Sequence, residues 1–133
     1  MDPNKLIIEW KTLKLGEKLY EENFINELKR LEKVYILSTG NIFEYIKIKI
    51  FISKFSLNAE CFYMNFLFKK NDKEEKKWIT FNIKKIVDDT LDKNFIYCDV
   101  YHFIMDDLYE FIPMYTNYIW NCKLSGLCKF LIR

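Results

Sequence analysis

Residues Glu44–Phe55, with the sequence EYIKIKIFISKF, carry the clearest periodic pattern in the chain. An isoleucine stands at every second position from Ile46 to Ile52, and the positions between them hold Lys47, Lys49 and Phe51. A period of two residues is typical of a β-strand that buries one face. The pattern therefore predicts a strand with an isoleucine face toward a core and a lysine-bearing face toward solvent.

Neighbouring segments extend this pattern into a sheet. Ala59–Lys70 and Trp78–Ile86 also alternate, and the charged segment Lys69–Lys77 between them has the composition of a hairpin loop. Val34–Leu37 is a short apolar run that supplies a further strand. Short polar connections between consecutive strands predict an antiparallel β-meander of about four strands.

The segments on either side of the meander favour helices. Glu17–Lys33 has its apolar residues on one helical stripe, as an amphipathic helix that covers a sheet does. Lys5–Leu15 fits either a short helix or an irregular arm, and Phe95–Tyr101 fits either a strand or a helix. Asp106–Trp120 is predicted as a helix interrupted by Pro113. The predicted fold class is therefore α+β, with an N-terminal helix and C-terminal helical segments over the meander.

Composition limits the class of protein. A chain of 133 residues, half of them hydrophobic, fits a single domain over residues 1–133 with its own core. Three glycines exclude a glycine-rich phosphate loop, and the four cysteines lack the spacing of a metal site. The sequence contains neither a signal-peptide pattern nor an apolar run long enough for a membrane span. We therefore expect a cytoplasmic protein without a metal or cofactor.

The charge distribution is strongly uneven. Between Val87 and Glu110 seven acidic residues face a single lysine, a net charge of −6 in a chain whose total is +2. The acidic residues are interleaved with tyrosine, phenylalanine and leucine. Such a segment can bind a basic partner, hold a metal cation, start a helix or remain as a solvated loop. The helix-start interpretation applies to Asp106, Asp107 and Glu110.

No motif assigns the chain to a family, so the leading hypothesis rests on the acidic segment between Val87 and Glu110. Aromatic residues supply contact area and carboxylates attract a basic protein. We therefore expect a non-enzymatic protein-binding inhibitor, of the immunity or antagonist type, that neutralises a basic partner such as a nuclease toxin. The expected partner-binding residues are Asp88, Asp89, Asp92, Asp99, Asp106, Asp107, Glu110, Tyr97, Tyr101 and Tyr109.

Two alternatives belong to other classes. A lysine and aromatic face of the predicted sheet, with Lys47, Lys49 and Phe51, suits single-stranded nucleic acid. Cys98 and His102, the only histidine, are compatible with a small hydrolase or nuclease. The scarcity of arginine and the absence of a second histidine weigh against these two alternatives.

Overall fold

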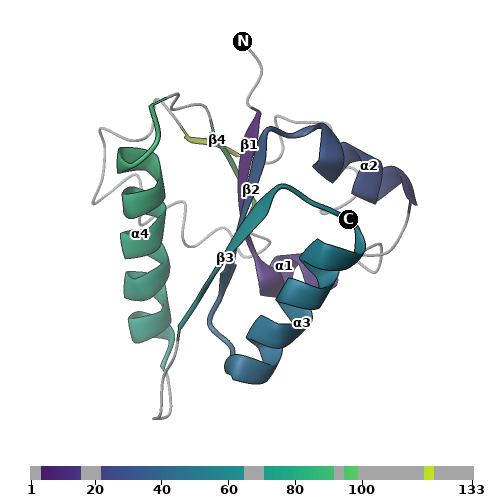
Figure 1. Ribbon diagram of the computed structural model, residues 1–133. Helices are drawn as coiled ribbons and strands as arrows, with labels where there is room; N and C mark the ends of the chain where they lie inside the picture. Colours follow the sequence, from purple (N-terminus) through teal and green to yellow (C-terminus); the bar gives the residue numbers. More distant parts are fainter. Residues whose placement is uncertain (1–3, 16–21, 65–70, 92–94, 99–118, 122–133) are drawn as a thin grey trace.

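The computed structural model describes residues 4–15, 22–64, 71–91, 95–98 and 119–121, in which strands and helices alternate (Figure 1). The strands are β1 (Lys5–Glu9), β2 (Lys33–Ser38), β3 (Ala59–Tyr63), β4 (Phe95–Cys98) and β5 (Ile119–Asn121). The helices are α1 (Trp10–Leu15), α2 (Glu22–Arg30), α3 (Ile42–Lys54) and α4 (Asp72–Asp88). Such alternation is typical of an α/β fold.

The five strands of the described residues form one sheet in the order β3-β2-β1-β4-β5, and each neighbouring pair is parallel. Ile7 of the central strand β1 lies level with Tyr35 of β2 and with Tyr97 of β4. A parallel sheet in this order, with helices on both faces, is a Rossmann-like arrangement. The predicted α+β class and its antiparallel β-meander are therefore wrong.

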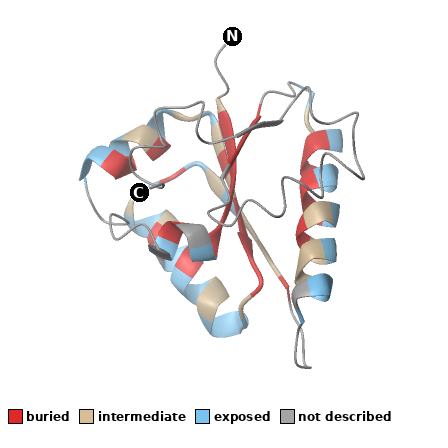
Figure 2. Ribbon diagram, turned by 180° about the vertical axis from the view of Figure 1, so that it is seen from behind, coloured by how far each residue is buried: buried red, intermediate tan, exposed pale blue. Residues whose placement is uncertain are grey.

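Helices cover both faces of the sheet. α1, α2 and α3 lie on one face and α4 lies on the other (Figure 1). Because successive strand residues point to opposite faces, Leu6 and Ile8 join the core under α1–α3 while Ile7 joins the core under α4. Figure 2 shows buried residues along the central strands and on the helix sides that face them.

α3 occupies the stretch that the alternation predicts to be a strand. Ile48 is fully buried at 0% exposure, whereas Ile46 and Ile50 are 48% and 61% exposed. A strand would place all three on one face, but in a helix a two-residue step turns the side chain by about 200°. The alternation therefore reflects an isoleucine-rich helix with apolar residues on both its inner and outer sides.

The start of α3 is fixed by a cap that the sequence contains. The side-chain oxygen of Asn41 accepts hydrogen bonds from the backbone N–H groups of Phe43 and Glu44, at 3.0 and 3.3 Å. Asparagine at the N-cap with glutamate three residues later is a helix-start pattern. The segment Ser38–Asn41 is thus the connection from a strand into a helix rather than a hairpin turn.

α4 replaces two further predicted elements. It covers most of the predicted hairpin loop Lys69–Lys77 and all of the predicted strand Trp78–Ile86. The side chain of Asn71 caps it by accepting a hydrogen bond from the Glu74 N–H at 2.9 Å. Its buried apolar residues recur at helical spacing: Ile79, Ile83, Ile86 and Val87.

Other local predictions fare better. β2 confirms the strand at Val34–Leu37, and α2 confirms a helix within Glu17–Lys33, although the described helix begins at Glu22. β3 lies within the predicted strand Ala59–Lys70, but it pairs with β2 in parallel.

The ambiguous segments also resolve in part. Lys5–Leu15 contains the central strand β1 and the short helix α1, and β4 occupies the first part of Phe95–Tyr101. Most of the predicted helix Asp106–Trp120 lies outside the described residues, and its last two positions belong to β5.

Candidate functional site

Rossmann-like sheets usually bind ligands beyond the carboxyl ends of their strands. At the end of β1, Glu9 is followed directly by Trp10, the first residue of α1. A dinucleotide-binding turn has glycines at this position, whose exposed N–H groups approach a pyrophosphate. Here the position holds an indole that is 4% exposed. The first strand-to-helix connection therefore has the geometry of a packed core and not of a phosphate loop.

The Trp10 side chain instead joins α1 to α3. Its indole Nε1–H donates a hydrogen bond to a Glu44 carboxylate oxygen at 2.7 Å, and the Lys14 ammonium lies 3.2 Å from the same oxygen. Lys47 lies 3.5 Å from the other oxygen. Burial raises the pKa of Glu44, but the hydrogen bonds from Trp10 and Lys14 and the charges of Lys14 and Lys47 outweigh burial and lower it. The Glu44 carboxylate thus connects α3, on which it lies, to Trp10 and Lys14 of α1.

This network predicts a loss of stability in acid. A carboxyl whose pKa is lowered by folding stabilises the fold above its unfolded pKa, near 4.5, and the stabilisation is lost as the pH falls through the folded pKa. Trp10→Phe removes the indole donor, so the folded pKa of Glu44 should rise toward its usual value and the acid-dependent loss should shrink. Urea unfolding at neutral and acid pH measures this difference. Identical pH profiles for the wild type and Trp10→Phe would contradict the assignment, and Glu44→Gln serves as the reference without the charge.

At the end of β2, local hydrogen bonds within the chain also use polar groups that could otherwise contact a ligand. The Ser38 hydroxyl accepts a hydrogen bond from the Gly40 N–H at 3.1 Å, and Asn41 caps α3. A Cβ atom at Gly40 would lie 2.6 Å from Cγ of Glu44, so glycine is required for this close approach. The described part of this sheet end is therefore built for packing.

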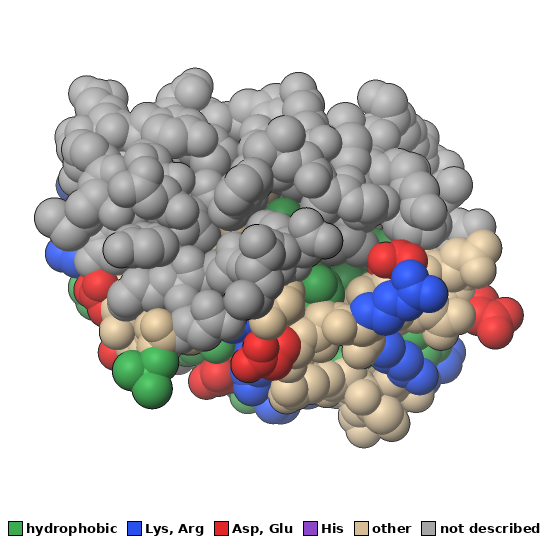
Figure 3. Space-filling view, turned by 90° about the horizontal axis from the view of Figure 1, so that it is seen from above, with side chains coloured by type: hydrophobic (Ala, Val, Ile, Leu, Met, Phe, Trp, Pro, Cys, Tyr) green, Lys and Arg blue, Asp and Glu red, His purple; other side chains and the backbone are tan. Residues whose placement is uncertain are grey.

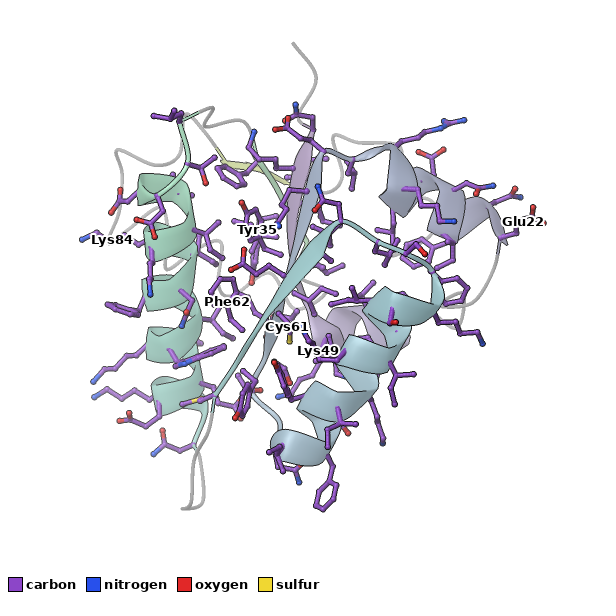
Figure 4. The ribbon with its side chains drawn as sticks, viewed as in Figure 1. Glu22, Tyr35, Lys49, Cys61, Phe62 and Lys84 are labelled. Atoms are coloured by element: carbon purple, nitrogen blue, oxygen red, sulfur yellow. The ribbon has the colours of Figure 1, made fainter. Side chains whose placement is uncertain are left out.

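A cleft of about 370 Å³ lies on the α4 face of the sheet, beside the carboxyl-terminal end of that helix. Figure 4 shows Tyr35 and Phe62 directed into the space between the sheet and α4. The cleft brings together residues of two strands and the helix end: Tyr35, Glu60, Phe62, Lys85, Ile86, Asp89 and Thr90. We call it the acid–aromatic cleft.

Its aromatic wall is fixed by packing. The rings of Tyr35 and Phe62 stack with centroids 6.5 Å apart and an interplanar angle of 28°. Tyr35 also contacts Phe95 of β4, with ring centroids 6.1 Å apart. A ring held between two others keeps its position when a ligand arrives, which lowers the cost of binding.

Its acidic side is formed by Glu60 and Asp89. The Glu60 side chain is 53% exposed, and Asp89 is the exposed C-cap residue of α4. A cation of the protein itself already contacts these groups. The Lys33 ammonium lies 6.0 Å from the Tyr35 ring centroid and 3.9 Å from the Glu60 carboxylate. A cation beside the cleft is thus shared between a π-face and a carboxylate.

Acidic residues at the end of α4 oppose the helix dipole. The carboxyl-terminal end of a helix is its negative end, where carboxylates are unfavourable by about 0.3–1 kcal/mol each at exposed positions. Asp88 is the last residue of α4 and Asp89 is its C-cap, and both are exposed. Lys85 in the last turn offsets part of this cost. Figure 3, which looks onto the end of the sheet where the strands begin, shows acidic side chains next to basic ones on the described surface.

The structure places three of the predicted partner-binding residues. Asp88 and Asp89 lie at the end of α4, and Asp89 lines the cleft. Tyr97 is 1% exposed on β4 and packs in the core under α4. The other predicted residues lie outside the described part of the chain: Asp92, Asp99, Tyr101, Asp106, Asp107, Tyr109 and Glu110. Tyr35, Glu60 and Phe62 were missed because they come from two strands that the sequence does not place next to α4.

The lysine and aromatic face predicted for nucleic acid does not exist as a sheet surface. Lys47 and Lys49 belong to α3, and Phe51 is 2% exposed and turned toward the core. An aromatic ring must be exposed to stack on a base. This correction follows from the helical state of the whole Glu44–Phe55 stretch.

The residues of the catalytic alternative are described only in part. Cys98 ends β4, and His102 lies outside the described residues. Cys61, on the face toward α3 near Lys49 (Figure 4), has a thiol whose pKa burial raises to about 11, against a smaller lowering by Lys49. A thiol with this pKa is protonated at neutral pH. In the described ranges no three His, Cys, Asp or Glu side chains are grouped closely enough to hold a metal ion.

Comparisons with other proteins add no assignment. No known protein family matches the sequence, and no curated protein or solved structure matches it significantly. Within the described ranges, none of the helices is both long enough and apolar enough to span a membrane. The fold and the site together define a Rossmann-like α/β protein with an acid–aromatic cleft. Because this fold hosts many unrelated functions, the fold alone does not assign one to this chain.

Proposed function

We propose that this protein is a non-enzymatic binding protein whose acid–aromatic cleft receives a lysine or arginine side chain of a basic partner protein. The observation that carries the proposal is the meeting of two carboxylates, Glu60 and Asp89, with the stacked rings of Tyr35 and Phe62 in one cleft. Neutralisation of a basic toxin such as a nuclease, in the cytoplasm, is the form of this function that the proposal favours.

The chemistry of the cleft suits a cationic side chain with an apolar stem. Methylene groups pack on aromatic rings, while the charged end reaches a carboxylate. The Lys33 ammonium, 6.0 Å from the Tyr35 ring centroid and 3.9 Å from the Glu60 carboxylate, is an example from the protein's own chain. A guanidinium also stacks flat on aromatic rings and pairs with carboxylates through two hydrogen bonds.

The position of Asp88 and Asp89 supports the proposal from a second side. They place two carboxylates at the end of α4, where Asp89 lines the cleft together with Lys85, at a cost to helix stability. Residues kept against local stability are often functional. Acidic groups around a cleft also speed the approach of a basic partner.

The test uses a short synthetic peptide rich in lysine and arginine as the partner's stand-in. The wild type should bind this peptide, more tightly at low salt than at high salt, and should not bind a glutamate-rich peptide of the same length that contains no apolar residues. The double variant Glu60→Lys, Asp89→Lys should weaken binding by at least about tenfold, equivalent to about 1.4 kcal/mol. Fluorescence anisotropy of the labelled peptide measures both affinities.

A matched control has the same change of net charge elsewhere. Glu22 lies on α2 (Figure 4) and Glu74 lies in the first turn of α4, and both are exposed and outside the cleft lining. Glu22→Lys, Glu74→Lys should keep most of the affinity. An equal loss in both double variants would show only a general charge effect and would overturn the cleft as the binding site.

A further inference from the structure

The outer side of α3 carries an apolar stripe that no described element covers. Its members are exposed by about half or more: Ile42 at 51%, Phe43 at 69%, Ile46 at 48% and Ile50 at 61%. The inner side of the same helix is fully engaged, with Ile48 and Phe51 in the core. On a helix these four positions lie within an arc of about 100°, so they form one apolar surface of the kind that interaction sites use.

The stripe has the spacing of a coiled-coil seam. Phe43, Ile46 and Ile50 follow the a, d, a positions of a heptad repeat, with Ser53 at the next d position. In this register the e and g positions that border the seam between Phe43 and Lys54 hold Lys47, Lys49 and Lys54. All three lysines are exposed. The seam is therefore apolar at its centre and positive on both sides.

The lysines select the partner. In a parallel or antiparallel pair of such helices, residues at e and g face the e and g residues of the other helix. A second copy of this chain would place lysine opposite lysine, and like charges across an interface are repulsive. We propose that the α3 seam docks an amphipathic helix of another protein that carries apolar residues at its a and d positions and Glu or Asp at its e and g positions.

This surface is separate from the acid–aromatic cleft. α3 and α4 lie on opposite faces of the sheet (Figure 1), so the two surfaces can be occupied at the same time. With both proposed surfaces, the protein would bind a basic side chain on the α4 face of the sheet and an acidic helix on the α3 face. The inference does not depend on the function proposed for the cleft.

The test uses two synthetic helical peptides with leucine at a and d, one with Glu and the other with Lys at every e and g position. The comparison uses the Glu60→Lys, Asp89→Lys protein, whose cleft no longer attracts a basic peptide. This protein should bind the Glu peptide at least about tenfold more tightly than the Lys peptide, because each e and g contact changes from attraction to repulsion. Lys47→Glu, Lys49→Glu, Lys54→Glu should reverse this preference. Such a reversal cannot come from loss of folding.

Two aspartate variants separate the seam from general stickiness. Ile46→Asp, Ile50→Asp should lose the Glu peptide and still bind the basic peptide at the cleft. Phe81→Asp changes an apolar residue that is 65% exposed on α4, and should keep both activities. Equal affinity for the two peptides, binding of neither, or a wild-type dimer that Ile46→Asp, Ile50→Asp dissociates would overturn the proposal.

Discussion

Ile48→Ala should lower the free energy of unfolding by about 2–5 kcal/mol, whereas Ile50→Ala, two residues away, should change it by less than about 0.5 kcal/mol. The side chain of Ile48 is fully buried against the sheet, and that of Ile50 is 61% exposed on the outer side of α3. Because both changes remove the same atoms from the same helix, the difference reports burial alone. Urea unfolding followed by circular dichroism measures both values.

This pair also separates a helix from the strand that the alternation predicts. In a strand Ile48 and Ile50 would share one face and would cost similar amounts when shortened. Equal losses of stability would therefore contradict the helical assignment of α3 and, with it, the seam.

Trp10→Ala should lower the free energy of unfolding by about 3–5 kcal/mol, the range for removal of a buried tryptophan. The indole is 4% exposed, its ring packs 5.7 Å from that of Phe51, and its N–H donates to Glu44. Removing it opens a cavity between α1 and α3 and takes a hydrogen bond from a carboxylate. The measurement is the unfolding free energy in urea at neutral pH.

The matched control for this substitution is an exposed aromatic residue. Phe43 is 69% exposed at the start of α3, so Phe43→Ala should change stability by less than about 0.5 kcal/mol. A loss below about 1 kcal/mol for Trp10→Ala would mean that Trp10, at the connection between β1 and α1, is not packed in the core.

The local sequence pattern predicts β2 and α2 well. In β2 the apolar residues form one continuous run, and in α2 the buried residues recur at helical spacing. Val34–Leu37 is a short apolar run, as strands buried on both faces are. Leu6–Ile8 and Phe95–Tyr97 are runs of the same kind in β1 and β4, and together the three runs point to a parallel sheet. Lys5–Leu15 nevertheless stayed ambiguous, because a run of three apolar residues fits a helix equally well.

The main wrong prediction was the strand at Glu44–Phe55, where the structure has α3. Its alternating isoleucines resemble the pattern of a strand. Isoleucine and phenylalanine occupy both the core side and the outer side of this helix, so the period of 3.6 is masked. The caps were the available signal. Asn41 with Glu44, and Asn71 with Glu74, mark the starts of α3 and α4.

The candidate cleft was predictable only at one end. The acidic residues Asp88 and Asp89 stand out in the sequence, and Asp89 lines the cleft. Tyr35, Glu60 and Phe62 reach it through the parallel pairing of β2 with β3 and the crossing of α4 over the sheet. Long-range pairing of this kind leaves no local pattern in a single sequence.

The most direct test of the proposed function is to follow the backbone amide signals of the wild-type protein by NMR while the lysine- and arginine-rich peptide is added. The largest shifts should fall on the lining of the acid–aromatic cleft, at Tyr35, Glu60, Phe62 and the segment from Lys85 to Thr90. The signals of Glu22 and of the outer side of α3 should change little. Shifts that concentrate on α3, or that spread evenly over every acidic surface residue, would contradict the assignment of the cleft.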